Sequence, residues 1–170
     1  MKKLLLLLPI VLSLISCSKD IINTELEAGY DIVKVNSEWV DEGCILNEND
    51  EKYIEMYVKS NNVDTSTIGD YEVVYSLAYS SEDYSCLRIV KVIDDEAPSI
   101  IFNAGIDTII KGEEWIDAGV TVADNYDNDV SVEIIGIVSN NIVGTYVITY
   151  TAADNSGNSK SIERIVNVIN

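Results

Sequence analysis

The strongest constraint on the fold is an internal repeat. Three blocks recur in the same order, 75 or 76 residues further along the chain. Such self-similarity is the sequence signature of tandem structural units. The blocks are EWVDEG at 38–43 with EWIDAG at 114–119, IGDYEVVY at 68–75 with VGTYVITY at 143–150, and RIVKV at 88–92 with RIVNV at 164–168.

The repeats define two candidate domains, a first repeat at residues 27–93 and a second repeat at residues 97–170. An acidic stretch at 94–96 separates them and ends at Ala97 and Pro98. Because proline forces the preceding residue into an extended conformation, a domain boundary is expected here. Residues 17–26 would then be a short tether ahead of the first repeat.

Both repeats have the pattern of β-strands. Runs rich in Val, Ile, Thr and Tyr alternate with clusters of Gly, Asn and Asp. The clearest alternation places Tyr146, Ile148 and Tyr150 on one face of a strand, as expected for a half-buried antiparallel strand. Short strands at this spacing predict an all-β chain of two tandem antiparallel β-sandwiches. In the second repeat they are expected near 99–103, 107–111, 119–123, 130–137, 144–153 and 160–168.

The second repeat also resembles a known family. Its ordered motifs are Ala97-Pro98, Gly112, WIDAGV at 115–120, ADN at 123–125, DNDV at 127–130, VGTY at 143–146, Tyr150 and ADNSGN at 153–158. Together they are similar to the bacterial Ig-like domain first named from a pesticidal crystal protein, a relative of hyalin repeats. The first repeat keeps the Trp-x-Asp-x-Gly and Gly-x-Tyr blocks but lacks both acidic turns, so it is interpreted as a divergent copy.

The Ig-like resemblance implies two structural features. Tyr71 and Tyr146 each follow a Gly-x pair, and they resemble the tyrosine corner of Ig-like sandwiches, in which the hydroxyl bonds back to the backbone. Trp39 and Trp115 occupy equivalent positions after a turn, where the family usually has another aromatic residue. A packing role explains that equivalence without a ligand.

The amino terminus has the features of an export signal. Lys2 and Lys3 precede a short apolar run at 4–14, and small Ser16 precedes Cys17. The ending resembles the lipobox of bacterial lipoproteins, which implies a signal peptide at 1–16 and lipidation of Cys17. Ser18 in place of Asp favours outer-membrane sorting, and the charged start resembles the tethers of surface lipoproteins. The membrane is therefore an expected partner, through a lipid anchor facing the cell surface.

Charge and composition exclude several classes of function. The chain has 29 acidic residues, 11 basic residues and no His, which gives a net charge of −18. An excess of negative charge repels phosphate backbones, so no nucleic-acid partner is expected. The lack of His removes the commonest general base, and no nucleophile elbow or phosphate loop is present, so the chain is not expected to be an enzyme.

Cysteine usage predicts a disulfide. Besides Cys17, only Cys44 and Cys86 are present, and disulfides persist in exported proteins. Two Cys without His supply too few ligands for a zinc site. Shifted by one repeat, these positions fall on Val120 and Ile162, which should therefore be core neighbours in the second repeat.

Two sets of residues are candidates for ligand binding. Trp39, Trp115, Tyr53 and Tyr57 could contact a glycan or protein, with core packing as the alternative for the two Trp. Asp124, Asp127 and Asp129 offer the oxygen ligands that Ca²⁺ requires, although the spacing is not that of an EF-hand. Asp154 and the linker carboxylates can reach the same junction. The alternative is that these side chains cap their own turns.

The sequence therefore predicts a non-catalytic, surface-displayed lipoprotein that serves as an adhesion, binding or spacer module. The alternative is a glycan-binding lipoprotein of a nutrient-uptake assembly, with exposed Trp or Tyr as its contact residues. No organic cofactor is expected, and Ca²⁺ is the one candidate ion. Sandwich folds host many functions, so the fold by itself does not identify the partner.

Overall fold

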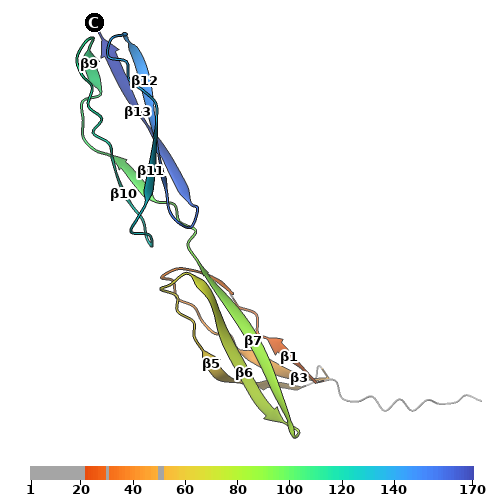
Figure 1. Ribbon diagram of the computed structural model, residues 1–170. Coiled ribbons are helices and arrows are strands. Elements are labelled where there is room, and N and C mark those ends of the chain that lie inside the picture. Colours follow the sequence, from red (N-terminus) through yellow and green to blue (C-terminus); the bar gives the residue numbers. More distant parts are fainter. Residues whose placement is uncertain (1–21, 30, 50–51) are drawn as a thin grey trace, which may run out of the picture.

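The computed structural model describes residues 22–29, 31–49 and 52–170, and these form two all-β, Ig-like sandwiches (Figure 1). The predicted signal peptide at 1–16 and Cys17 lie outside the described residues. Within the described part of the chain, no helix is long and apolar enough to cross a membrane.

The first domain, residues 22–93, packs a three-stranded sheet against a four-stranded sheet. The first sheet has the order β1-β3-β4 and the second has the order β2-β7-β6-β5. All neighbours are antiparallel except β2 and β7, which run parallel. The strands are β1 (Ile22–Leu26), β2 (Ile32–Lys34), β3 (Cys44–Glu48), β4 (Lys52–Glu55), β5 (Tyr57–Asn61), β6 (Gly69–Tyr79) and β7 (Glu82–Ile93).

The second domain, residues 97–170, repeats this arrangement with a smaller first sheet. Its sheets have the orders β10-β8 and β11-β12-β13-β9, and β9 runs parallel to β13. The six strands match the ranges expected from the sequence to within one or two residues at each end. They are β8 (Ser99–Phe102), β9 (Thr108–Ile110), β10 (Val120–Ala123), β11 (Ser131–Ile135), β12 (Gly144–Ala153) and β13 (Ser159–Ile169).

The two domains correspond strand by strand, except that the first domain has one additional strand. Strand β4 of the first domain has no counterpart among the strands of the second. The prediction that residues 22–26 belong to the tether is wrong. These residues form β1, which pairs with β3 from Ile22 opposite Glu48 to Leu26 opposite Cys44. Most of β1 is exposed, so its alternation of apolar and polar residues is weak, and backbone pairing along the sheet edge holds it.

Each domain has a core built on its longest hairpin. In the first domain, Val73 and Tyr75 of β6 pack with Cys44 and Met56, and in the second, Ile148 and Tyr150 of β12 form the equivalent cluster. The predicted disulfide between Cys44 and Cys86 is present and links the two sheets of the first domain. Val120 and Ile162, the equivalent positions of the second domain, both pack against the second cluster.

The tyrosine corners are confirmed in both domains. The Tyr71 hydroxyl donates to the Thr67 carbonyl at 2.7 Å, and the Tyr146 hydroxyl donates to the Ile142 carbonyl at 2.8 Å. Both bonds return to the backbone four residues upstream, so each closes the loop that leads into the central hairpin.

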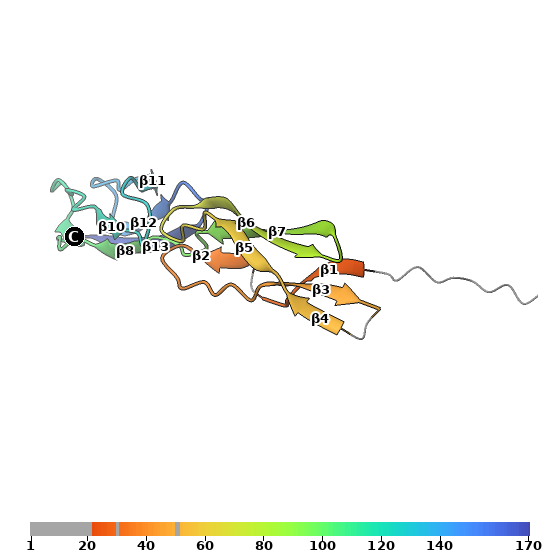
Figure 2. The same ribbon diagram turned by 90° about the horizontal axis from the view of Figure 1, so that it is seen from below.

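The two domains lie end to end in an elongated molecule (Figures 1 and 2). The described chain begins at one end, with β1, and its carboxyl terminus lies at the other. Few polar contacts join the domains at the junction. The Lys34 ammonium pairs with Asp95 of the linker at 2.9 Å, and the Ile68 amide donates to the Tyr126 hydroxyl at 3.4 Å.

Candidate functional site

One buried arginine per domain, Arg88 and Arg164, is the polar centre of each sandwich. Their exposed fractions are 1% and 3%. Arg164 donates to Asp107 at 2.9 Å and to the carbonyls of Asn103 and Gly119 at 2.8 and 3.1 Å. Arg88 makes the same set of bonds, to Asp31, Glu27 and Gly43. These side chains hold the loops before β2 and β9 against the sandwich, which is a structural role.

Neither arginine was predicted from the sequence to have a role, although the signal was present. Arg164 has the same strand parity as Val166 and Val168, which both point into the core. An arginine at an inward position in both repeats indicates a buried, hydrogen-bonded guanidinium, because an unpaired charge would be too costly there.

A second polar pair, between a buried tyrosine and a more exposed aspartate, recurs beside each arginine. The hydroxyl of Tyr75 donates to Asp41, and the hydroxyl of Tyr150 donates to Asp117. Burial of the ring, followed by the hydrogen bond to the carboxylate, raises the pKa of each tyrosine to about 12. The Asp of the Trp-x-Asp-x-Gly block is thereby explained as the acceptor of a core tyrosine.

We expect Tyr75 and Tyr150 to ionise late in a phenolate absorbance titration. Their pKa of about 12 exceeds the ordinary value of about 10, so the folded state holds these protons more tightly. The raised pKa therefore stabilises the folded state below about pH 10, and this contribution is lost as the pH rises toward about 12. Tyr75→Phe and Tyr150→Phe should each remove one late step, whereas exposed Tyr57→Phe should leave both. Loss of neither step in the core variants would contradict the assignment.

The two tryptophans pack rather than present a platform. Trp39 and Trp115 are both half-buried against the core clusters of their domains. The Trp115 indole also donates to the Ile106 carbonyl at 3.0 Å. Their equivalence in the two repeats is therefore explained by packing, the alternative that the sequence left open.

Tyr53 and Tyr57 are exposed, at 58% and 74%, but they do not share a surface depression. Tyr57 lines an open depression with Leu77 and Tyr84, whereas Tyr53 lines another with Met56 and Tyr75. The predicted aromatic residues are thus spread over several places and form no single stacking surface.

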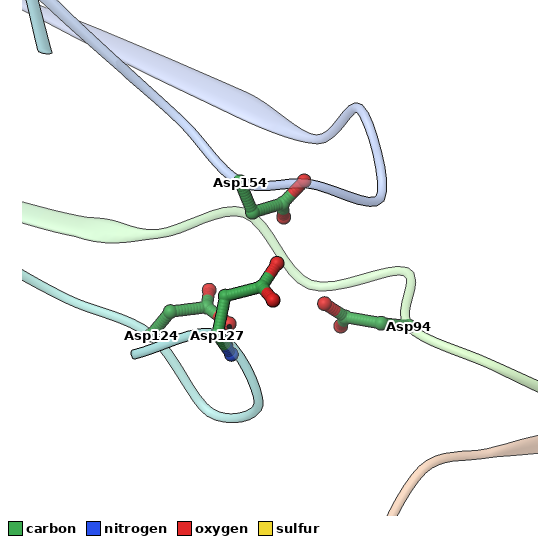
Figure 3. Close-up of side chains that lie close together, drawn as sticks. All are labelled: Asp94, Asp124, Asp127 and Asp154. Atoms are coloured by element: carbon green, nitrogen blue, oxygen red, sulfur yellow. Dashed lines mark hydrogen bonds between the residues drawn. The ribbon is translucent and has the colours of Figure 1, made fainter. Parts of the chain in front are cut away.

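Four aspartates converge at the end of the second domain that faces the junction (Figure 3). Asp94 follows β7, Asp124 and Asp127 follow β10, and Asp154 follows β12. Each aspartate contributes one carboxylate oxygen, and these four oxygens all lie within 4.8 Å of one another. Asp124 and Asp127 were predicted from the sequence to share a site, whereas Asp129 is exposed and lies outside this group.

Most oxygens in this cluster cap the surrounding loops. Asp124 Oδ1 accepts from the amides of Tyr126 and Asp127, both at 2.9 Å. Asp127 accepts from the amide and side chain of Asn155 at 2.8 and 3.0 Å. Burial acts to raise the pKa of Asp154, but hydrogen bonds from the Asn158 side chain and nearby amides outweigh it and lower the pKa. The capping alternative is therefore correct for these atoms.

The described residues form two Ig-like sandwich modules that expose loops and sheet faces. Residues 106–168 match the family described as "Bacterial surface protein, Ig-like domain". A surface Ig-like domain of this kind is typically non-catalytic. No curated protein matches the chain.

Proposed function

We propose that the chain is a surface-displayed lipoprotein that holds a binding face away from the membrane, as an adhesion or spacer module. The observation that supports this most directly is the linear arrangement, with the start of the described chain and the carboxyl terminus at opposite ends of two sandwiches (Figure 1). An anchor ahead of β1 would place the second domain farthest from the membrane. The family match falls on that distal domain, at residues 106–168.

The proposed anchor is a lipid on Cys17 in the outer membrane, with the domains facing outward. The lipobox-like ending and Ser18 support this placement. We further propose that the first domain is a diverged copy of the same Ig-like unit, related to the pesticidal crystal protein type. The equivalent strands and the shared Arg, Tyr and Asp contacts of the two domains support common descent.

Surface display can be tested in a Gram-negative host. We expect the wild-type chain to incorporate an alkyne-labelled fatty acid and to be shaved from intact cells by added protease. Cys17→Ala should abolish the label and release the protein from the membrane fraction, while a matched Cys44→Ala, Cys86→Ala variant keeps the label. Labelled protein that is protected from protease on intact cells would place it on the periplasmic face and contradict display.

Glycan binding is the second candidate function, and one observation favours it. Tyr57 is 74% exposed, and it borders a depression with Tyr84. Aromatic side chains provide contact area at little entropic cost. Glycan-array binding by soluble protein that begins at Ser18, lost in Tyr57→Ala and kept in Tyr53→Ala, would select this function over a spacer or adhesin.

A further inference from the structure

The geometry points to a calcium site at the domain junction, formed by the carboxylates of Asp94, Asp124, Asp127 and Asp154. This inference does not depend on lipidation, surface display or glycan binding. Of the carboxylates that the sequence places near the junction, Asp94 and Asp154 join Asp124 and Asp127, whereas Asp129 does not.

The spacing of the four carboxylates fits the coordination sphere of one ion. Ca²⁺ binds oxygen ligands at about 2.3–2.6 Å, so two ligands on opposite sides of the ion are about 5 Å apart. One oxygen from each of the four aspartates lies within 4.8 Å of the others. A single cation can therefore contact all four at once.

Two buried oxygens in the cluster lack any hydrogen-bond donor. Asp94 is nine-tenths buried, with an exposed fraction of 9%, and its Oδ2 atom is fully buried and unpartnered. The Oδ2 atom of Asp124 is in the same state. Figure 3 shows the carboxylate of Asp94 directed toward those of the other three. A buried carboxylate oxygen with neither donor nor counter-charge is strongly unfavourable, so this arrangement calls for a cation.

No basic side chain supplies that charge. None of the salt bridges between described residues involves any of the four aspartates; the linker's Lys34 contact goes to Asp95 instead. Four negative charges within this distance repel one another, and at a partly buried position solvent screens them little. A bound divalent ion would remove both the repulsion and the two unpaired oxygens.

The loops hold the carboxylates in place without an ion. Backbone amides bind Asp124 Oδ1, Asn155 binds Asp127, and Asn158 binds Asp154. Asn125 and the amide of Glu96 bind Asp94 Oδ1, at 3.4 and 3.2 Å. Partners of this kind orient metal ligands and are part of a built site.

The donor chemistry selects Ca²⁺ among common divalent ions. The cluster contains only hard carboxylate oxygens, and neither His nor Cys is present to favour zinc. Ca²⁺ tolerates irregular, carboxylate-rich geometry, whereas Mg²⁺ demands a near-octahedral shell and keeps several waters. Because Asp94 belongs to the linker, the ion would tie the linker to the second domain and restrict bending at the junction.

Calcium titration calorimetry on chelator-treated soluble protein that begins at Ser18 tests this site. We expect one ion per chain with a Kd of about 10⁻⁴ to 10⁻³ M, the range of extracellular calcium modules. Asp94→Asn and Asp127→Asn should each weaken binding about tenfold or more. Exposed Asp129→Asn, just outside the cluster, is the matched control and should bind as wild type does.

Small-angle scattering supplies an independent measurement. If calcium restricts bending at the junction, it should narrow the range of end-to-end lengths that the molecule adopts. We expect this in wild type and in Asp129→Asn, but not in Asp94→Asn. Circular dichroism checks whether the Asp94→Asn variant is folded. If that variant does not fold, Asp127→Asn is used in its place. The inference is overturned if no binding is seen at about 10 mM Ca²⁺, if Mg²⁺ binds more tightly than Ca²⁺, or if Asp129→Asn weakens binding as much as Asp94→Asn.

Discussion

Replacing Arg164 with alanine should lower the free energy of unfolding of the second domain by about 2–4 kcal/mol, chiefly through the carbonyls that it leaves without a donor. The change leaves the carbonyls of Asn103 and Gly119 without their donor and removes the ion pair with Asp107, whose side chain is 44% exposed. It also removes the contact between the guanidinium and the Phe102 ring, whose centroid lies 4.9 Å away. A loss of this size is a large fraction of the roughly 5–15 kcal/mol that stabilises a typical domain, so the urea midpoint of the second domain should fall markedly.

The effect can be measured by urea unfolding in a Trp39→Phe background, where Trp115 alone reports on the second domain. Glu163→Gln, on the exposed face of the same strand, is the matched control and should change stability by no more than about 0.5 kcal/mol. Arg164→Lys should fall in between, because one ammonium cannot replace a planar fork that reaches three acceptors. A loss in Arg164→Ala no greater than that in the control would contradict the proposed structural role.

Reducing the disulfide should destabilise the first domain by roughly 4 kcal/mol and leave the second unchanged. Cys44 and Cys86 are 42 residues apart, and in the chain-entropy model the bridge restrains the unfolded chain by that amount. Urea unfolding with and without reductant measures the difference, with Trp39 as the probe of the first domain and Trp115 as that of the second.

The second domain offers a matched control for this prediction. It has Val120 and Ile162 where the first domain has the bridge, so Cys44→Val with Cys86→Ile tests whether apolar packing replaces the covalent link. We expect this pair to be more stable than Cys44→Ala with Cys86→Ala, which leaves a cavity, but less stable than the oxidised wild type. Equal stability of the oxidised and reduced wild-type protein would show that the bridge is not a structural element.

Local sequence signals account for most of the fold. The alternation through Tyr146, Ile148 and Tyr150 predicts β12 to the residue, and the Gly-x-Tyr pairs predict both tyrosine corners. Strand β1 was missed because an edge strand held by backbone bonds has little side-chain periodicity. The disulfide followed from counting cysteines, without any knowledge of which strands they join.

The site was only partly predictable because its members come from three segments. Asp124 and Asp127 are three residues apart, so chain spacing brings them together. The orientation of Asp94 depends instead on how the linker leaves β7, and that of Asp154 on the turn after β12. Asp129 is as close in sequence but lies beyond the turn, so its proximity along the chain does not translate into proximity in space.

The short parallel pairs β2–β7 and β9–β13 determine how each domain would respond to mechanical load. When the molecule is stretched, force reaches the short strand at its amino-terminal end and the long strand at its carboxyl-terminal end. The backbone hydrogen bonds between Thr108–Ile110 and the end of β13 then bear the force at the same time, in shear. In a hairpin that is pulled apart from one end, by contrast, the bonds break one after another. A domain connected in this way resists extension until several bonds break at once.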